Sequence, residues 1–572
     1  MRMARVGILL DQAAKMRRHR YGFNVFEAFA GEVLSHAGIP FQWIDHVSDV
    51  TERQLDVLIV ACMDEHEDNA ETIWSFAEQG GAVISYAGLK CLTSRLGCRA
   101  ERDITVGYAS ASLQEEERSL LRFLKARPWL QQDGEQNNAV VQASGSLRKD
   151  EPAGREAGAA LLQFSIGKGR IDRWAVNIPY TLVHFQQGTE PVLDDGIPAT
   201  DGSGAVDEGI LKADDRIALD WEYDRTTTET SAPYFKEPYA DLWKEVMIEH
   251  LLKLVLEQGL TLPFISYWPD GISSVATISH DSDLNIDESA EATLDTLRDC
   301  GIQSTWCMIE PGYSPYIYDK VKQAGHELAF HYNALEANDG KWDEAEFDRQ
   351  FAWLKQAIGA DRVTSNKNHY TIFQGWSELF DWCEHHGIEV DQTRGPSKRG
   401  NIGFLFGTCH PYFPIAWFDQ GNRSYNVLEI SFLTQDLDHH LLADSSVVEP
   451  FLEQVMRVEG VAHFLFHQVH ILNQEPVNKA IRKVVAEARE RGFTFWTSQQ
   501  INDWERARRK VCITGIDANA EARVKHGTEL KDAVVWIPVQ EGAANREIVN
   551  RFGVPCVKQV LGAPRTTIPS LS

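Results

Sequence analysis

The stretch TISHDSD, residues 277–283, ends an apolar run with side chains that could do chemistry. Asp281 and Asp283 are two residues apart, so on an extended strand they point the same way. Two carboxylates this close repel each other unless a cation lies between them or one of them carries a proton. A divalent metal held by one carboxylate, with a water molecule held by the other, removes the conflict. The pair therefore predicts a metal site at the end of a strand.

Two histidines could complete this site. His331 ends the segment HELAFH, and His369 lies at the end of the segment SNKNHY, one residue before Tyr370. Two histidines and one carboxylate leave a coordination position open, where the metal acidifies a water molecule toward neutral pH. An alternative is that His331 is a buried core histidine, and that His369 does not bind the metal at all.

The elements that must position these residues alternate along the second half of the chain. From residue 274 onward, apolar strands alternate with amphipathic helices about seven times in roughly 240 residues. This order predicts a distorted (β/α)7-type barrel with its chemistry at the carboxyl ends of the strands. Twelve of the nineteen histidines lie between His280 and His470, many of them where a strand is expected to end.

The first part of the chain also alternates between buried strands and helices, which predicts a parallel sheet. Its order resembles a flavodoxin-like or amidotransferase-like domain. We therefore expect an α/β protein with three parts: residues 1–262 form this first domain, with a long surface loop at 185–232; residues 263–510 form the catalytic barrel; and residues 511–572 form a small β-rich domain.

The bulk composition excludes some classes of partner. The chain has 572 residues and a net charge of −27, which argues against binding to nucleic acid or to an anionic membrane surface. No segment approaches the roughly 20 apolar residues that span a bilayer. The nine cysteines form no CxxC pair, and the first residues resemble a strand rather than a secretory signal, so we expect a cytoplasmic protein. The oligomeric state is not predicted.

A family resemblance follows from several motifs taken together. WPDG and TISHDSD, then AGHELAFH, NKNHY, HFLFH and GFTFWTSQQINDW follow the motif order of the polysaccharide deacetylase superfamily, carbohydrate esterase family four and its relatives. The resemblance covers about residues 268–508. It implies that Asp281 is the base that activates the attacking water, and that Asp283 and His331 bind the metal. It also implies that His467 is the general acid and that the backbone N–H of Tyr370 stabilises the oxyanion.

The chain departs from the family pattern at two motifs. The family has a second histidine four residues after the first, where this chain has Leu335. In place of the family's Arg-x-Pro motif, the chain has Lys367, Asn368 and His369. We expect His369 to replace the missing ligand, since the amide of Asn333 is a poorer one. Lys367 would then keep Asp281 ionised, and Asp391 lies where the family often has a residue that tunes the acid histidine.

These features predict a metal-dependent hydrolase that removes an acetyl group from an N-acetylated sugar or oligosaccharide, with zinc as the metal and cobalt or nickel as alternatives. One alternative is a non-hydrolytic carbohydrate-binding or scaffolding protein on a degenerate deacetylase barrel, which Leu335 motivates. Another is a glycosyltransferase in which the two aspartates hold a nucleotide sugar through manganese.

Other side chains admit two interpretations. His463 and His470 are rivals of His467 for the acid role. The segment DLDHHLLAD, with Asp436, Asp438, His439 and His440, could be a second metal site but is more typical of an exposed polar loop. Tyr412 and Trp417 could stack on a sugar or pack in the core. Cys62 lacks a nucleophile elbow and is expected to be a buried thiol.

Overall fold

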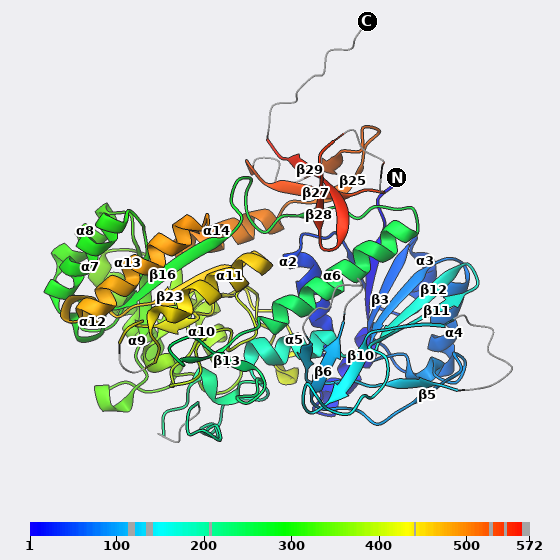
Figure 1. Ribbon diagram of the computed structural model, residues 1–572, viewed down its shortest axis with the longest axis horizontal. Helices are drawn as coiled ribbons and strands as arrows, with labels where there is room; N and C mark the ends of the chain where they lie inside the picture. Colours follow the sequence, from blue (N-terminus) through cyan, green and yellow to red (C-terminus); the bar gives the residue numbers. More distant parts are fainter. Residues whose placement is uncertain are drawn as a thin grey trace, which may run out of the picture.

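The structure is a computed structural model that describes residues 1–111, 120–132, 141–204, 209–439, 442–525, 530–540, 542 and 546–562. The chain forms two α/β lobes that lie side by side, with a small sheet above the place where they meet (Figure 1). Most of the buried apolar side chains of both lobes belong to one continuous core.

The N-terminal lobe is built on one sheet whose first five strands are parallel. In spatial order the strands are β2 (Gln42–Ile44), β1 (Val6–Leu10), β3 (Val57–Cys62), β4 (Ala82–Tyr86), β12 (Gly169–Trp174), β11 (Leu161–Ile166) and β9 (Val141–Ser144). β11 pairs antiparallel with both of its neighbours. The helices of this lobe are α1 (Gln12–Arg20), α2 (Ala30–His36), α3 (Asp49–Glu52), α4 (Glu67–Glu78), α5 (Ile178–Gln187) and α6 (Tyr239–Glu257).

A second, smaller sheet covers part of this lobe. It consists of β10 (Ser146–Lys149), β6 (Gly107–Ser110) and β7 (Leu121–Phe123), and a two-stranded ladder joins β5 (Cys98–Ala100) to β8 (Trp129–Gln131). The sequence interpretation assigned no strands here. The flavodoxin-like or amidotransferase-like character of the lobe stays a prediction.

The second lobe contains a curled sheet of nine described strands. In spatial order they are β21 (Leu428–Glu429), β20 (Val390–Asp391), β19 (Ser365–Asn368), β18 (Glu327–Tyr332), β17 (Thr305–Met308), β16 (Val275–Asp281), β23 (Val461–Leu465) and β22 (Thr434–Gln435), with β24 (Thr494–Phe495) paired to β16. All of these pairs are parallel. The chain is therefore an α/β protein with a curled parallel sheet, which confirms the predicted class. In the described residues the sheet runs from β21 to β22 without these two strands pairing, so a half-barrel stands where a (β/α)7-type barrel was predicted.

Local sequence explains the elements of this sheet and the helices that cover it. All seven residues of β16 are buried, as expected for a parallel strand that is covered on both faces. The helices are α7 (Asp287–Cys300), α8 (Pro315–Gln323), α9 (Glu344–Ile358), α10 (Glu378–His386), α11 (Val448–Val458), α12 (Gln468–Asn473), α13 (Glu475–Glu490) and α14 (Ser498–Arg509). α9 begins where the Asp343 side chain accepts a hydrogen bond from the Glu346 N–H, and it ends at Gly359, whose φ of 62° suits glycine.

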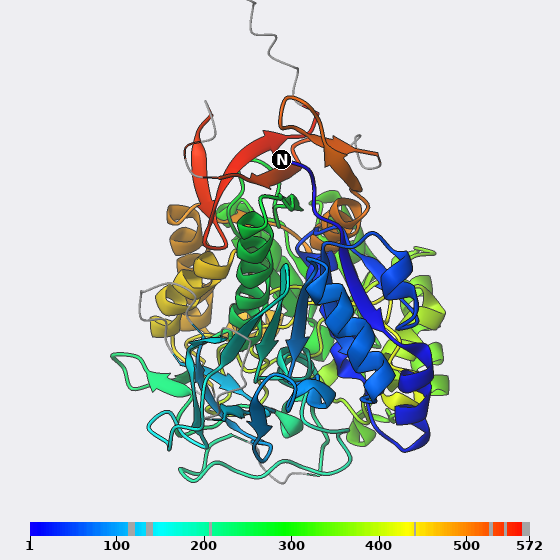
Figure 2. The same cartoon turned by 90° about the vertical axis from the view of Figure 1, so that its right-hand side faces the viewer.

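The small sheet above the lobes takes strands from distant parts of the chain. β15 (Phe264–Ile265) pairs with β27 (Val534–Pro538), which continues to β29 (Val554–Val560) and β28 (Ile548–Arg551). A separate hairpin joins β25 (Ile513–Ile516) to β26 (Ala522–Val524). The N-terminus lies beside this sheet (Figure 2), and the Thr261 hydroxyl donates a hydrogen bond to the Pro538 carbonyl. The predicted domain boundaries stay predictions.

The segment 185–232 is wrongly predicted as a surface loop at its centre. Lys212, Asp214 and Asp215 are all buried, and η3 (Ala213–Arg216) lies against the barrel lobe. The Asp214 carboxylate accepts hydrogen bonds from the Ser397 N–H at 3.1 Å and the Ser397 hydroxyl at 2.8 Å. We call residues 188–204 and 209–232 the strap, because their contacts reach from one lobe to the other.

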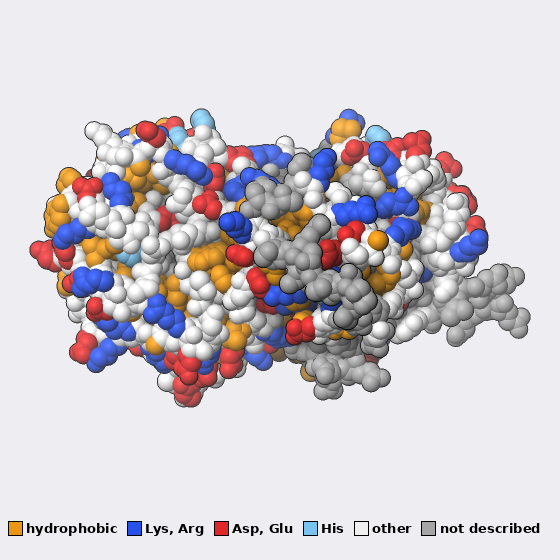
Figure 3. All heavy atoms as spheres, turned by 90° about the horizontal axis from the view of Figure 1, so that it is seen from above, with side chains coloured by type: hydrophobic (Ala, Val, Ile, Leu, Met, Phe, Trp, Pro, Cys, Tyr) orange, Lys and Arg blue, Asp and Glu red, His pale blue; other side chains and the backbone are white. Residues whose placement is uncertain are grey.

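The surface is polar and mixed in charge. Seen from above, lysine and arginine side chains lie interspersed with aspartate and glutamate side chains (Figure 3), so the net charge is not gathered into one patch on this face. None of the described helices has the length and apolar character needed to cross a bilayer. All nine cysteines are free thiols.

The buried carboxylate of the strap gives a stability prediction. Asp214→Ala leaves the Ser397 donors and the Asn401 amide, which lies 2.9 Å from Asp214, without their acceptor. We expect a loss of about 2–3 kcal/mol in the free energy of unfolding, seen as a melting temperature lower by several degrees. Asp361→Ala, at an exposed position, is the matched control. Equal melting temperatures for the two variants would contradict the structural role of the strap.

Candidate metal centre

The predicted site residues come from neighbouring strands of the curled sheet, at their carboxyl ends. Asp281 ends β16, and Asp283 begins the short helix η4 (Asp283–Asn285). His331 lies near the end of β18. Lys367 lies in β19, and His369 begins η6 (His369–Thr371) directly after that strand. Because parallel strands share one carboxyl edge, five side chains from three strands reach the same place.

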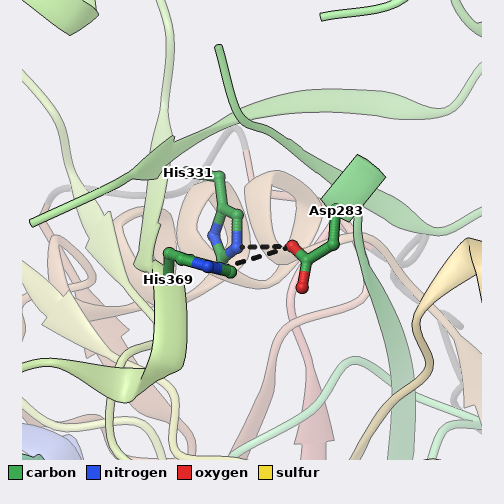
Figure 4. Close-up of side chains that lie close together, drawn as sticks. All are labelled: Asp283, His331 and His369. Atoms are coloured by element: carbon green, nitrogen blue, oxygen red, sulfur yellow. Dashed lines mark ion pairs between the residues drawn. The ribbon is translucent and has the colours of Figure 1, made fainter. Parts of the chain in front are cut away.

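The structure brings together Asp283, His331 and His369. Asp283 Oδ1 lies 3.4 Å from His331 Nε2 and 3.4 Å from His369 Nδ1. The two imidazoles point toward the carboxylate from one side (Figure 4), and all three ligand atoms lie within 4.8 Å of one another. Atoms about 2.1 Å from one ion at tetrahedral angles are about 3.4 Å apart. The spacing therefore fits a shared cation.

The hydrogen bonds of His331 fix which of its nitrogens is free. Its Nδ1 lies 2.8 Å from the Lys367 carbonyl oxygen and must donate to it, because a carbonyl cannot donate. In the neutral imidazole, Nε2 then carries a lone pair aimed at Asp283. His331 Nε2 and Asp283 Oδ1 are both buried and have no hydrogen-bond partner. Two facing lone pairs repel, so the donor set fits a metal ion, with the backbone carbonyl orienting the ligand.

Asp281 lies beside the three ligands but is held by a cation of the protein. Lys367 Nζ lies 3.3 Å from Asp281 Oδ1 and donates to the Ser279 hydroxyl at 2.5 Å. Burial raises the pKa of the Asp281 carboxyl, but the positive charges of Lys367 and of the protonated His467 hold the pKa below its ordinary value. Asp281 therefore carries a negative charge at neutral pH.

The Ser279 hydroxyl also connects this lysine to His463, one of the rival histidines. His463 Nδ1 lies 3.1 Å from the Ile430 carbonyl, and its Nε2 lies 2.8 Å from Ser279 Oγ. Burial lowers the pKa of His463 to about 3. His463 is therefore neutral, and it supports Lys367 rather than supplying a proton.

His467 faces the same centre from β23 and bonds to a carboxylate on its other side. Its Nε2 lies 3.6 Å from Asp283 Oδ2 and 3.9 Å from Asp281 Oδ2. Its Nδ1 hydrogen-bonds to Asp436 Oδ2, and its backbone N–H donates to Asp436 Oδ1 at 2.8 Å. Burial lowers the pKa of His467, but Asp436 and the other two carboxylates outweigh it and raise the pKa to about 10.

Asp436 replaces Asp391 as the partner of His467, which corrects the sequence prediction. Asp391 is buried, and its carboxylate accepts hydrogen bonds from the Asn366 amide at 2.8 Å and the Thr393 hydroxyl at 2.9 Å. Asp391 thus binds side chains on its own side of the sheet, three strands away from β16. Asp436 follows β22, the strand next to β23, where it reaches His467 directly.

The sequence does not predict Asp436 as the partner of His467, because the structure around Asp436 differs from the predicted one. The sequence favours an exposed polar loop for DLDHHLLAD, residues 436–444, but Asp436 and His439 are buried. β23 ends at Leu465 and α12 begins at Gln468, so His470 lies one helical turn after His467. His440 lies outside the described residues.

Asp436, His467 and His470 form a second group whose ligand atoms lie within 4.8 Å of one another. His470 Nε2 lies 3.9 Å from Asp436 Oδ2. Because His467 Nδ1 already bonds to Asp436, that nitrogen has no lone pair for a metal. This arrangement is typical of an imidazole whose charge a carboxylate stabilises.

The departures from the family pattern have local explanations. The Leu335 N–H donates to the Asn333 side-chain oxygen at 3.0 Å, so this amide is occupied within its own turn. Tyr370 is 51% exposed and, with a φ of 57°, turns the chain at the rim of a cavity of about 1100 Å³. Asp281, Asp283, His369 and His467 line this cavity.

The remaining alternatives are settled by burial. Tyr412 is a core residue, with its hydroxyl bonded to the Gln186 carbonyl at 2.7 Å. Trp417 is half-buried and does not line the cavity of the metal centre, so neither aromatic ring forms a platform there. Cys62 is 1% exposed, and burial raises its pKa to about 12, as expected for an unreactive thiol.

Comparison with solved structures finds polysaccharide deacetylases. A protein proposed to be a polysaccharide deacetylase, from Mycobacterium smegmatis, is 17% identical over 42% of this chain and 92% of that chain, with a TM-score of 0.32. The Xyl-CE4 domain of a xylanase from the hindgut metagenome of Trinervitermes trinervoides is 13% identical over 40% of this chain and 90% of that chain, with a TM-score of 0.25.

A third structure, a CE4 family pseudoenzyme from Bacillus anthracis, is 11% identical over 40% of this chain and 66% of that chain, with a TM-score of 0.25. No family model and no curated protein sequence matches the chain. At these identities and TM-scores, the case for function rests on the side chains of this chain alone.

Metal binding provides the direct test of the centre. His331→Ala should weaken the binding of Zn²⁺ by at least about 100-fold, because loss of a supporting contact alone costs 10–100-fold. Titration calorimetry of the metal-free protein with Zn²⁺ measures this, and metal analysis of the purified protein gives the stoichiometry. His385→Ala, which changes an exposed histidine, is the matched control. Equal affinity in both variants would show that any ion binds elsewhere.

Proposed function

We propose that this protein is a metal-dependent hydrolase that removes an acetyl group from the nitrogen of an N-acetylated sugar or oligosaccharide. One observation carries the proposal: the buried lone pairs of His331 Nε2 and Asp283 Oδ1 face each other at 3.4 Å, with His369 Nδ1 at the same distance from the carboxylate. Zinc is the metal proposed, with cobalt or nickel as alternatives, since the donor set of two imidazoles and one carboxylate suits all three.

Asp283, His331 and His369 would hold the metal. When bound there, a divalent cation supplies Lewis-acid chemistry, polarising the acetamide carbonyl and making a water molecule more acidic. Asp281 lies 3.7 Å from His331 Nε2, close enough to receive a proton from water that attacks the carbonyl carbon. The depressed pKa of Asp281, caused by Lys367 and the protonated His467, keeps it ready as a base.

His467, whose Nε2 lies 3.6 Å from Asp283 Oδ2, supplies the proton that the reaction needs. Its raised pKa keeps it protonated at neutral pH, and its Nε2 faces Asp283 and the cavity. As the carbon–nitrogen bond breaks, His467 Nε2–H donates its proton to the leaving nitrogen. The proton taken by Asp281 balances the one given by His467, and the products are acetic acid and the amine, which at neutral pH become acetate and the ammonium form of the sugar.

The cavity supports a substrate larger than an acetamide. Its volume of about 1100 Å³ exceeds that of a typical small-molecule site. We assign the backbone N–H of Tyr370 as a donor to the oxyanion, because this residue lines the cavity one position after His369. Lys212, from the strap, also lines the cavity, so the N-terminal lobe shapes the substrate site.

Acetate release tests the proposal. Metal-loaded protein should release acetate from chitooligosaccharides, and Asp281→Asn should lower kcat by about 10²–10⁴-fold, because it removes the base. Asp287→Asn, at the start of α7, is the matched control. If the protein binds Zn²⁺ and the sugar but releases no acetate, the non-hydrolytic carbohydrate-binding alternative is correct. If it binds Zn²⁺ but no sugar, the substrate assignment is wrong.

The pH profile tests the role of Asp436. A general acid works while it is protonated, so kcat/KM should fall as the pH rises through the pKa of His467, which Asp436 raises to about 10. The Asp436→Asn variant lacks the negative charge that most strongly opposes the effect of burial on His467. The pKa of His467 therefore falls. We expect the alkaline limb to move to lower pH by at least one unit, so that kcat/KM at pH 10 falls at least about fivefold. An unchanged alkaline limb would exclude His467 as the acid that Asp436 supports.

A further inference from the structure

A second cavity, of about 550 Å³, lies at the carboxyl ends of β3, β4 and β12 in the N-terminal lobe. It shares no lining residue with the cavity of the metal centre. Thr189 of the strap and Trp417 of the barrel lobe line its other side, so it lies near α5, where the two lobes meet (Figure 1). Open parallel sheets bind ligands in the crevice outside their carboxyl ends.

Four basic side chains line this cavity, although the chain as a whole carries −27. They are Arg18, Lys90, Lys125 and Arg127, and three carboxylates, Glu27, Glu65 and Asp103, line it as well. Arg18 Nη1 lies 3.7 Å from Glu27 Oε1. Arg127 bonds to Asp103 through two of its nitrogens, at 2.7 and 2.8 Å. In the part of the chain that the structure describes, Lys125 has no carboxylate within ion-pair distance, and its ammonium lies 4.6 Å from the Tyr180 ring. The ammonium of Lys125 is therefore available to an anion.

A buried guanidinium behind the cavity wall adds to this charge. Arg173 is 1% exposed and donates to the carbonyls of Gly88 at 2.8 Å and Arg127 at 3.0 Å, two residues that line the cavity. Its Nη1 is buried without a hydrogen-bond partner, and no described carboxylate forms an ion pair with Arg173. A buried charge without a counter-ion is costly, and an anion bound in the cavity would offset that cost.

The other lining groups suit a hydroxylated ring. Tyr86 is 5% exposed, and among the described residues its hydroxyl has no hydrogen-bond partner. The rings of Tyr180 and Trp417 line the cavity. Asn177, the N-cap of the ten-residue helix α5, places the positive end of that helix here. Glu27 and Glu65 supply acceptors for hydroxyl groups.

We propose that this cavity binds a small sugar that carries one anionic group, a carboxylate or a phosphate, with Lys125 bound to the anion and Tyr86 bound to a hydroxyl. The volume lies within the range of about 300–1,000 Å³ found for small-molecule sites. The site binds its ligand without covalent chemistry, because the Cys62 thiol at the end of β3 is buried and protonated. It is independent of the function proposed for the metal centre.

Titration calorimetry of the full chain with four probes tests the site: glucuronate, glucose 6-phosphate, glucose and inorganic phosphate. We expect one anionic sugar to bind at least tenfold more tightly than glucose and than phosphate, and the comparison of the two anionic sugars identifies the group recognised. Lys125→Met should weaken that binding at least tenfold, while Lys479→Met, at an exposed helix position, should not change it. His331→Ala, at the metal centre, should leave it unchanged.

Three results would overturn the proposal. One is that neither anionic sugar binds more tightly than glucose, and another is that phosphate binds as tightly as both. The third is an unchanged affinity in Lys125→Met. Tyr86→Phe, which removes a single oxygen, serves as a second variant should Lys125→Met fold poorly, and we expect it to weaken binding about tenfold. Unchanged affinity in Tyr86→Phe would contradict the hydroxyl contact.

Discussion

The repulsion between two buried lone pairs is the constraint on which the site depends. His331 must donate its Nδ1 proton to the Lys367 carbonyl, so its Nε2 faces Asp283 Oδ1 with nothing between them to donate a hydrogen bond. His331 is fully buried, whereas Asp283 and His369 line the cavity. A cation relieves the repulsion and satisfies both atoms at once. The curled parallel sheet serves this arrangement by bringing the ends of β16, β18 and β19 to one edge.

Asp281 and His467 lie beside this centre and carry opposite charges. A residue from a different strand stabilises each charge. Lys367 reaches Asp281 from β19 and keeps it ionised, whereas Asp436 reaches His467 from the end of β22 and keeps it protonated. The pKa of Asp281 is lowered and that of His467 is raised, although burial alone would do the reverse to each. A base and an acid can therefore coexist at neutral pH within one buried site, which is what acyl transfer to water requires.

Sequence patterns were informative where local chemistry decides the structure. The sequence predicts β16, β18 and α9 because apolar runs, helical periodicity and a final glycine act within a few residues. It does not predict the burial of Asp436, which follows a strand of only two residues and depends on contacts with β23. The strap also depends on distant partners, since the Asp214 carboxylate accepts hydrogen bonds from Ser397 and Asn401 of the second lobe.

The spacing within β19 explains how the centre tolerates leucine at position 335. His331 pairs with Lys367 in the parallel register, and side chains two residues apart on a strand point to the same face. Lys367 and His369 therefore project toward the same centre, one to the carboxylate of Asp281 and the other to that of Asp283. A ligand from the turn after β18 is then unnecessary. One strand end therefore places both the ammonium beside Asp281 and the imidazole beside Asp283, which is the arrangement that the proposed function needs with leucine at position 335.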